Sequence, residues 1–132
     1  MRYACLIYYD PRELFGGSPE ANAALAECEG HDEVLKRTGN FVLGDTLVMP
    51  QDAITVRIRD GSMSATDGPF MESKEMLGGI VVIEAADLNE AVRLASGHPI
   101  ARIGAVEVRP VVDFSEPRPD LRETLHGALS EG

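Results

Sequence analysis

The sequence is poor in several residue types that would reveal its chemistry directly. It has no tryptophan, two cysteines, two lysines and 5% aromatic residues among 132. It lacks an apolar run of about 18 residues, so it predicts no transmembrane helix. Its start has tyrosines in a short apolar run and predicts a strand, not a signal peptide. Cys5 and Cys28 lie in different predicted elements with apolar neighbours, which predicts buried thiols in a reducing, cytoplasmic compartment. No further ligands at regular spacing accompany them, so we expect no metal site.

Positive charge is also scarce. The chain has 12 Lys and Arg residues against 22 Asp and Glu residues, a formal net charge of −10. Such a field repels phosphate backbones and anionic lipids, so we expect neither nucleic acid nor a membrane surface as a partner. No phosphate-binding glycine loop, nucleophile elbow or haem, flavin or PLP signature is recognisable, and we therefore expect no cofactor.

The pattern of apolar residues predicts alternating strands and helices. Residues 2–9 read as a strand that is apolar on both faces. Ser18 and Pro19 are a typical helix start, and that helix is expected to end at Gly39. Asp87 and Glu90 form a capping box that opens a second helix. Further strands are expected at 41–48, 54–59, 62–66, 78–84 and 105–112, with a tight hairpin at Asp60-Gly61 and a short helical turn at 72–76.

This order predicts an α+β, ferredoxin-like βαββαβ unit with an extra hairpin over residues 1–114. Two helices can cover only one face of its sheet, yet strands 2–9 and 78–84 are apolar on both faces. A second copy of the chain is the simplest cover, so we expect a twofold homodimer with a sheltered pocket between the sheets. Residues 115–132 are expected to be a tail with a short amphipathic helix.

One stretch resembles a known family. Thr66-Asp67-Gly68-Pro69-Phe70, followed by Glu72 to Gly79, resembles the DGPF signature of the YCII-related (YciI-like) proteins. Residues 54–61 and the ending from His98-Pro99 to Pro110 also look like that family. The resemblance covers residues 1 to about 114. It implies a dimeric α+β barrel, and for some members a sigma factor as partner.

YciI-like relatives also have a His–Asp pair suspected of acid–base catalysis. In this sequence the histidine of that pair would fall near Cys28 or His31. The aspartate of that pair precedes a proline after the second helix, and in this sequence His98 occupies its place. The pair is therefore not preserved residue for residue.

Two residues are the candidate catalytic groups. His98 follows a helix end and precedes Pro99, where it could act as general acid or base or simply cap the helix. Asp67 opens the DGPF turn, where it could bond its own downstream amide or orient His98.

Five further residues are candidates for substrate binding, and each also has a structural explanation. Tyr8 is expected to point into the dimer gap, and His31 lies on an apolar helix stripe where core packing is the alternative. Arg57 could hold an anion or face water. Phe70 is expected in a core or pocket wall, and Lys74 could bind substrate or form a solvated ion pair.

Two functions remain open on the sequence alone. The first is a small cytoplasmic enzyme, without cofactor, that performs acid–base or hydrolytic chemistry on a small molecule. The second is a non-catalytic ligand- or protein-binding dimer that acts on a transcription regulator such as a sigma factor.

Overall fold

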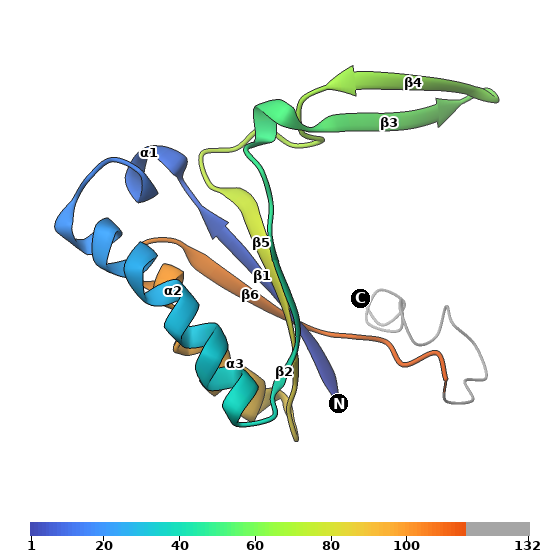
Figure 1. Ribbon diagram of the computed structural model, residues 1–132. Coiled ribbons are helices and arrows are strands. Elements are labelled where there is room, and N and C mark those ends of the chain that lie inside the picture. Colours follow the sequence, from blue (N-terminus) through green and yellow to red (C-terminus); the bar gives the residue numbers. More distant parts are fainter. Residues whose placement is uncertain (116–132) are drawn as a thin grey trace, which may run out of the picture.

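The computed structural model describes residues 1–115, which form one antiparallel sheet, its covering helices and a separate two-stranded arm (Figure 1). The elements are β1 (Arg2–Tyr9), α1 (Pro11–Leu14), α2 (Pro19–Arg37), β2 (Phe41–Thr46), η1 (Pro50–Asp52), β3 (Ile54–Arg59), β4 (Ser62–Asp67), β5 (Met76–Glu84), α3 (Leu88–Ser96), η2 (Pro99–Arg102) and β6 (Ala105–Pro110). No helix in this described part is long and apolar enough to cross a membrane.

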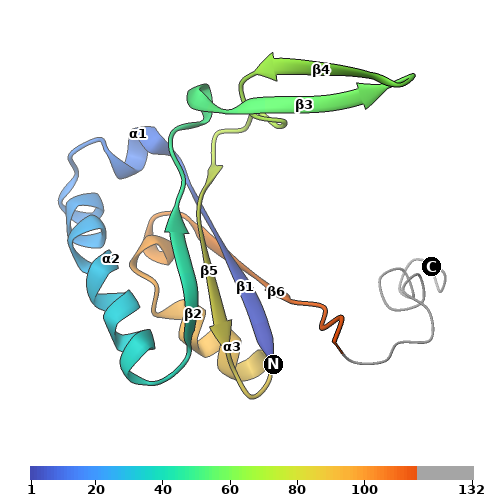
Figure 2. The same cartoon turned by 45° about the vertical axis from the view of Figure 1, so that its right-hand side comes forward.

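The sheet has the strand order β2-β5-β1-β6, and every neighbouring pair is antiparallel. Helices α2 and α3 both lie on one face of it (Figure 2). A βαββαβ chain path with the first and third of its four sheet strands at the centre is the ferredoxin-like arrangement. The predicted α+β class and ferredoxin-like unit are therefore confirmed.

Local capping chemistry explains where the long helix begins and ends. The Ser18 side chain accepts a hydrogen bond of 3.1 Å from the Ala21 N–H, and Pro19 occupies the first helical position. The helix ends before Gly39, whose φ of 77° suits a residue without a side chain. Helix α2 thus matches the prediction at both ends.

Helix α3 begins with the predicted capping box. The Asp87 carboxylate accepts a hydrogen bond of 2.9 Å from the Glu90 N–H, and the Glu90 carboxylate accepts one of 3.3 Å from the Ala86 N–H. The first bond satisfies an N–H group that the first helical turn leaves without a partner, and the second ties the helix to the residue just before its cap.

Removal of this cap is expected to destabilise the protein measurably. Asp87→Ala should lower the free energy of unfolding by about 1 kcal/mol, because the Glu90 N–H loses its partner. Urea denaturation followed by circular dichroism measures this loss. Asp87→Ser retains an acceptor and is the control; an equal loss in both variants would contradict a capping role.

The core lies between the sheet and the two long helices. Alternate residues of β1 point toward the helices, so that Tyr3, Cys5, Ile7 and Tyr9 are all buried. The remaining buried hydrophobic residues of this cluster are Leu14, Ala24, Leu35, Val81, Ile83, Ala85, Ala91, Ala95 and Ile100. The helix-facing side of the sheet is therefore covered within the chain.

The opposite face, here called the open face, is also apolar at its centre. The strand register places Leu6 beside Ile80 and Ala4 beside Val82 in the two middle strands. Charged residues stand at the ends of the first of these rows, with Asp45 next to Ile80 on one side and Glu107 next to Leu6 on the other. An apolar centre with a polar border is the usual anatomy of a protein interface.

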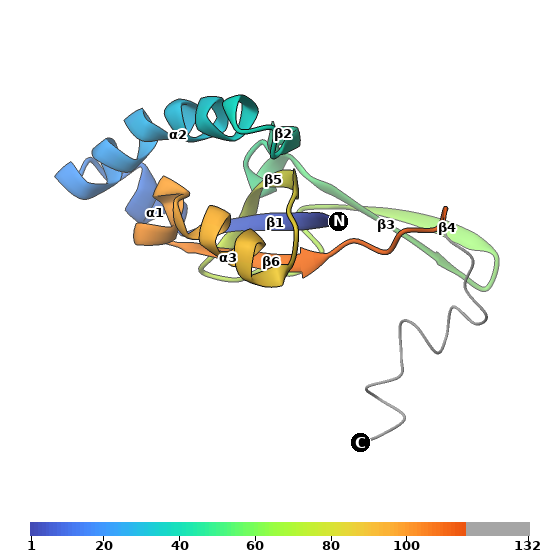
Figure 3. The ribbon, with the colours of Figure 1, turned by 90° about the horizontal axis from the view of Figure 1, so that it is seen from below.

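Strands β3 and β4 pair only with each other, across the predicted Asp60-Gly61 turn. Both turn residues have positive φ values, 52° and 75°, which suits the two-residue turn of a tight hairpin. This pair, here called the arm, extends away from the main sheet on the side opposite the helices (Figures 1 and 3).

Some local predictions were wrong. Pro11 was expected only to end the first strand, but Asp10 accepts a hydrogen bond of 3.0 Å from the Arg12 N–H and caps the short helix α1. Residues 72–75 form no helical turn, and β5 already begins at Met76. The second and last strands end earlier than expected, at Thr46 and Pro110. The predicted tail helix lies outside the described residues.

Candidate functional site

His98 is held at the junction between α3 and η2. Its Nδ1 accepts a hydrogen bond of 3.1 Å from the Ile100 N–H, which caps the 3₁₀ turn that begins at Pro99. The side chain is 7% exposed. An ion pair between Arg102 of η2 and Glu27 of α2 joins this turn to the long helix. The ring is therefore fixed in place by backbone and neighbours.

This hydrogen bond determines which nitrogen has the proton. Because Nδ1 accepts, a neutral His98 has its hydrogen on Nε2. Within residues 1–115 Nε2 has no hydrogen-bond partner. In the same residues, every fully buried side-chain nitrogen or oxygen has a hydrogen-bond partner. Nε2 is therefore not completely enclosed, and its N–H is not used by another residue of the described chain.

A second histidine packs against the first. The ring of His31, from α2, lies edge-on to His98 with 5.0 Å between ring centroids. Burial, and then the charge of His31, lower the pKa of His98 to about 4. Burial also lowers the pKa of His31, although the adjacent Asp32 carboxylate acts in the opposite direction. Around neutral pH the pair is therefore uncharged.

A cavity of about 220 Å³ lies beside His98 on the helix-covered side of the sheet. Asp32 and Cys28 of α2 contribute its other reactive groups, and the rings of Tyr9 and Phe15 form an aromatic wall with 5.8 Å between centroids. The remaining lining residues are Ile7, Leu14, Leu25, Gly44, Asp45, Thr46, Gly78, Gly79, Val81 and Ile100. A carboxylate and a neutral imidazole thus share one small, mostly apolar space.

Cys28 is not arranged as a nucleophile. Its thiol donates a hydrogen bond of 3.2 Å to the Ala24 carbonyl. Burial raises its pKa, the acidic neighbours Asp32 and Glu27 add to this, and only Arg102 opposes them. The group is therefore a neutral thiol around pH 7 and forms part of the cavity wall.

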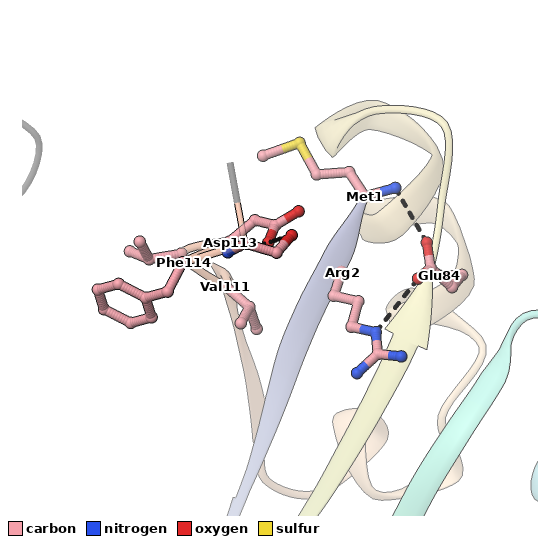
Figure 4. A pocket seen from close by; sticks show the side chains of 8 residues that line it. Met1, Arg2, Glu84, Val111, Asp113 and Phe114 are labelled. Atoms are coloured by element: carbon pink, nitrogen blue, oxygen red, sulfur yellow. Dashed lines mark hydrogen bonds and ion pairs between the residues drawn. The ribbon is translucent and has the colours of Figure 1, made fainter. Parts of the chain in front are cut away.

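A larger hollow, of about 740 Å³, lies at the far end of the sheet, beside the chain start (Figure 4). Glu84 accepts a hydrogen bond of 2.9 Å from the Met1 amino group and one of 3.2 Å from Arg2 Nε. These bonds lower the pKa of Glu84. Phe114 and Val111 line the other side. Because these charges satisfy one another at an exposed surface, the hollow lacks the buried reactive group that His98 supplies elsewhere.

The family model of the YCII-related domain matches residues 1–115. The chain belongs to the YCII-related family. This YCII-related protein is 32% identical over 114 residues to an uncharacterised protein from Rhizobium meliloti (strain 1021), with 84% of this chain and 92% of that protein covered. The relative supports the family assignment and adds no activity.

A solved structure has the same fold. It is 5-chloro-2-hydroxyhydroquinone dehydrochlorinase from Burkholderia phenoliruptrix AC1100, in complex with 2,5-dihydroxybenzoquinone. The TM-score is 0.52 at 16% sequence identity, over 87% of this chain and 97% of the dehydrochlorinase. At this identity the likeness establishes the fold of the YCII-related protein and not its reaction.

The structure brings together only some of the residues that the sequence singled out. His98 and His31 meet in the core of the YCII-related protein. Arg57 and Phe70 meet elsewhere, with the guanidinium 4.9 Å from the ring centroid. Phe70 is 69% exposed, so its expected place in the core was wrong. Asp67 ends β4 on the arm and lines a different hollow from His98. Within the described residues it is therefore not beside His98, and its catalytic role stays a prediction.

Two other predicted binding residues lie away from the cavity. Tyr8 points to the open face, as expected, and donates a hydrogen bond of 3.5 Å to Glu107. Lys74 is exposed in the segment between β4 and β5. Neither lines the cavity beside His98.

Sequence reasoning missed Asp32, which lines this cavity together with Asp45. It lies four residues after Cys28 on the same helix, so one turn places both side chains on the same side. That spacing could have indicated that Asp32 and Cys28 share a site. An aspartate in a helix is, however, most often an ordinary surface residue, so nothing in the sequence singled it out. Tyr9 was not singled out, because its place in the apolar strand at residues 2–9 does not show that a cavity lies next to it.

Proposed function

We propose that this YCII-related protein is a cofactor-independent enzyme that moves a proton on a small molecule bound in the cavity beside His98. One observation supports this more than any other. A buried, neutral imidazole has one nitrogen occupied by a backbone N–H and the other not used by any described residue, in a cavity that also contains a carboxylate. Paired groups with different proton affinities in a shielded site are typical of acid–base catalysis.

The two groups have complementary roles in this proposal. The Asp32 carboxylate takes a proton from the substrate. The Nε2–H of His98 donates to the substrate oxygen on which negative charge develops. A neutral imidazole suits this role, because burial disfavours the charged form and the neutral ring still has an N–H to donate. Substrate and product differ only in the position of a proton or in a group lost after proton removal.

The cavity favours a small, flat, oxygen-bearing substrate. Its volume of about 220 Å³ admits a single ring, and Tyr9 and Phe15 offer aromatic contacts. The net charge of −10 disfavours strongly anionic ligands. The dehydrochlorinase of the same fold holds 2,5-dihydroxybenzoquinone, so hydroxylated rings and small enolisable carbonyl compounds are the first compounds to test.

Isotope exchange measures proton transfer directly, whatever the complete reaction is. In D₂O, the protein should exchange carbon-bound protons of at least one such compound for deuterium, as followed by ¹H NMR. His98→Asn keeps an acceptor for the Ile100 N–H but removes the Nε2 donor, and Asp32→Asn removes the base. Each should slow exchange about 100-fold or more.

A matched control is available on the same helix. Glu29 is an exposed carboxylate of α2 outside the cavity, and Glu29→Gln should exchange at the wild-type rate. If His98→Asn and Asp32→Asn exchange as fast as Glu29→Gln, the assignment of the two groups is wrong.

We further propose that the protein functions as a homodimer through the open face. The apolar pairs Leu6–Ile80 and Ala4–Val82 lie on the face of the sheet away from the helices, where they are only half-buried, and charged residues border the first pair. Burial of such a surface is favourable by about 25 cal/mol per Å² of apolar area. Sedimentation velocity at micromolar concentration distinguishes this dimer from a monomer.

A non-catalytic binding protein is the alternative function. The separation of Asp67 from His98, together with the acidic surface, favours it, since acidic proteins dock on basic partners. It predicts no isotope exchange with any compound and a specific complex with a purified sigma factor in a titration experiment.

A further inference from the structure

The arm has two chemically different faces. Cross-strand pairs place Ile54, Val56 and Ile58 of β3 on the same side as Met63 and Ala65 of β4. The alternate positions are polar or charged: Thr55, Arg57, Arg59, Ser62, Ser64 and Thr66. The four large apolar side chains of this set are each between 61% and 66% exposed. Within residues 1–115 the apolar face of the arm is therefore uncovered.

A two-stranded hairpin of this kind needs a partner. Isolated hairpins are marginally stable in water, and three or more strands or a packed face are needed to hold them. Contiguous exposed apolar surface on a soluble protein usually marks an interaction site. The ladder from Ile54 to Arg59 is nevertheless fully paired and regular. The apolar side chains are thus arranged for a contact that the described part of the chain does not supply.

The position of the arm indicates what that contact is. The arm leaves the sheet near the ends of β2 and β5 and extends on the side opposite the helices, which is the side of the open face (Figures 1 and 3). The open face and the arm therefore border the same space. A second copy that covered the open face would also be next to the arm.

Charge favours a second copy over a nucleic acid or a lipid surface. Residues 54–67 contain two arginines and two aspartates, so the arm is neutral in a chain of net charge −10. Two strongly negative copies repel least where such a neutral segment meets the other copy. Arg57 and Arg59 place positive charge on the polar face of the same arm, and Asp45 and Glu107 border the open face with negative charge.

We propose that the arm of each protomer packs its apolar face on a second copy of the chain. The inference rests on the proposed homodimer and adds a reciprocal clasp to it. The arm then contributes directly to dimer affinity.

The test compares two double variants that add the same charge to opposite faces of the arm. Val56→Asp with Ile58→Asp places two carboxylates on the apolar face. Ser62→Asp with Ser64→Asp places two on the other face, opposite Arg59 and Arg57. Analytical ultracentrifugation should show the dimer dissociation constant raised about 100-fold or more by the first pair and less than about threefold by the second.

The outcomes separate the arm from the dimer itself. Ile80→Asp, on the open face, should also dissociate the dimer. If Ile80→Asp dissociates it and the apolar-face arm variant does not, the clasp is wrong and the homodimer stands. A monomeric wild-type protein would overturn both.

A second measurement avoids dependence on variants that fail to fold. In a dimer mixed from ¹³C-methyl-labelled and unlabelled wild-type chains, intermolecular NOEs should reach the methyl groups of Ile54, Val56 and Ile58. Their absence in a proven dimer would overturn the clasp.

Discussion

Acidification from about pH 7 to about pH 4 is expected to lower the free energy of unfolding by about 3 kcal/mol through His98 alone. The pKa of His98 is about 4 in the folded protein, whereas an unfolded histidine has its ordinary value of 6.5. Between these values the unfolded chain binds a proton that the folded chain does not. Stability is therefore complete above pH 6.5 and is lost as the pH falls toward 4.

Urea denaturation at a series of pH values and one protein concentration measures this loss. The chain also has 22 Asp and Glu residues, whose protonation in acid also changes stability, so the comparison with His98→Asn is essential. The variant keeps an acceptor for the Ile100 N–H but cannot titrate. Wild type and variant should converge in stability as the pH falls; parallel curves would show that His98 is not protonated on unfolding.

The His31 ring provides an independent check. Its charge is one cause of the low pKa of His98, so His31→Asn should raise the His98 pKa. An NMR titration of the His98 ring protons reads this shift directly. An unchanged midpoint would leave burial as the sole cause.

The second large effect is expected from the smallest possible substitution. Gly104→Ala should cost about 3 kcal/mol of unfolding free energy, because the new methyl group would collide with the Tyr8 carbonyl oxygen. That oxygen belongs to the backbone of β1 and cannot rotate away. Gly104 directly precedes β6, so relief requires movement of β6 away from β1, whose Tyr8 pairs with Ala105.

Gly30→Ala provides the opposite case in the same protein. Gly30 lies in α2, where an added methyl group would meet open space, so this substitution should stabilise by about 0.5–1 kcal/mol. Urea denaturation of both variants at equal protein concentration measures the contrast. Equal effects would show that the close approach at Gly104 is not a packing constraint.

Much of the fold was predictable because its signals are local. Ser18 with Pro19, and Asp87 with Glu90, satisfy backbone N–H groups a few residues away, so they mark helix starts wherever the chain is placed. Asp60-Gly61 defines its hairpin for the same reason. The helical turn at 72–76 failed because its residues offered helix propensity without such a cap.

The candidate site was only partly predictable, because it depends on which distant elements meet. His98 and His31 were singled out by residue type, and the structure brings them into contact. Asp67 was also singled out, but the direction of its arm is a tertiary property that no turn motif states. Asp32 became a candidate only when the cavity beside Cys28 was known.

The glycines in the cavity wall have a consequence for the range of ligands. Gly44 pairs with Val81 and Gly79 with Ile7, so side chains at both positions would point toward the helices and the cavity. A methyl group would be tight at either place, 3.1 Å from the Phe41 ring or 3.3 Å from the Asp45 carbonyl oxygen, without a collision. Single substitutions at these two positions can therefore narrow the space for a ligand while the strand pairing persists. Related proteins can thus differ in the size of ligand that they accept and still keep the same fold.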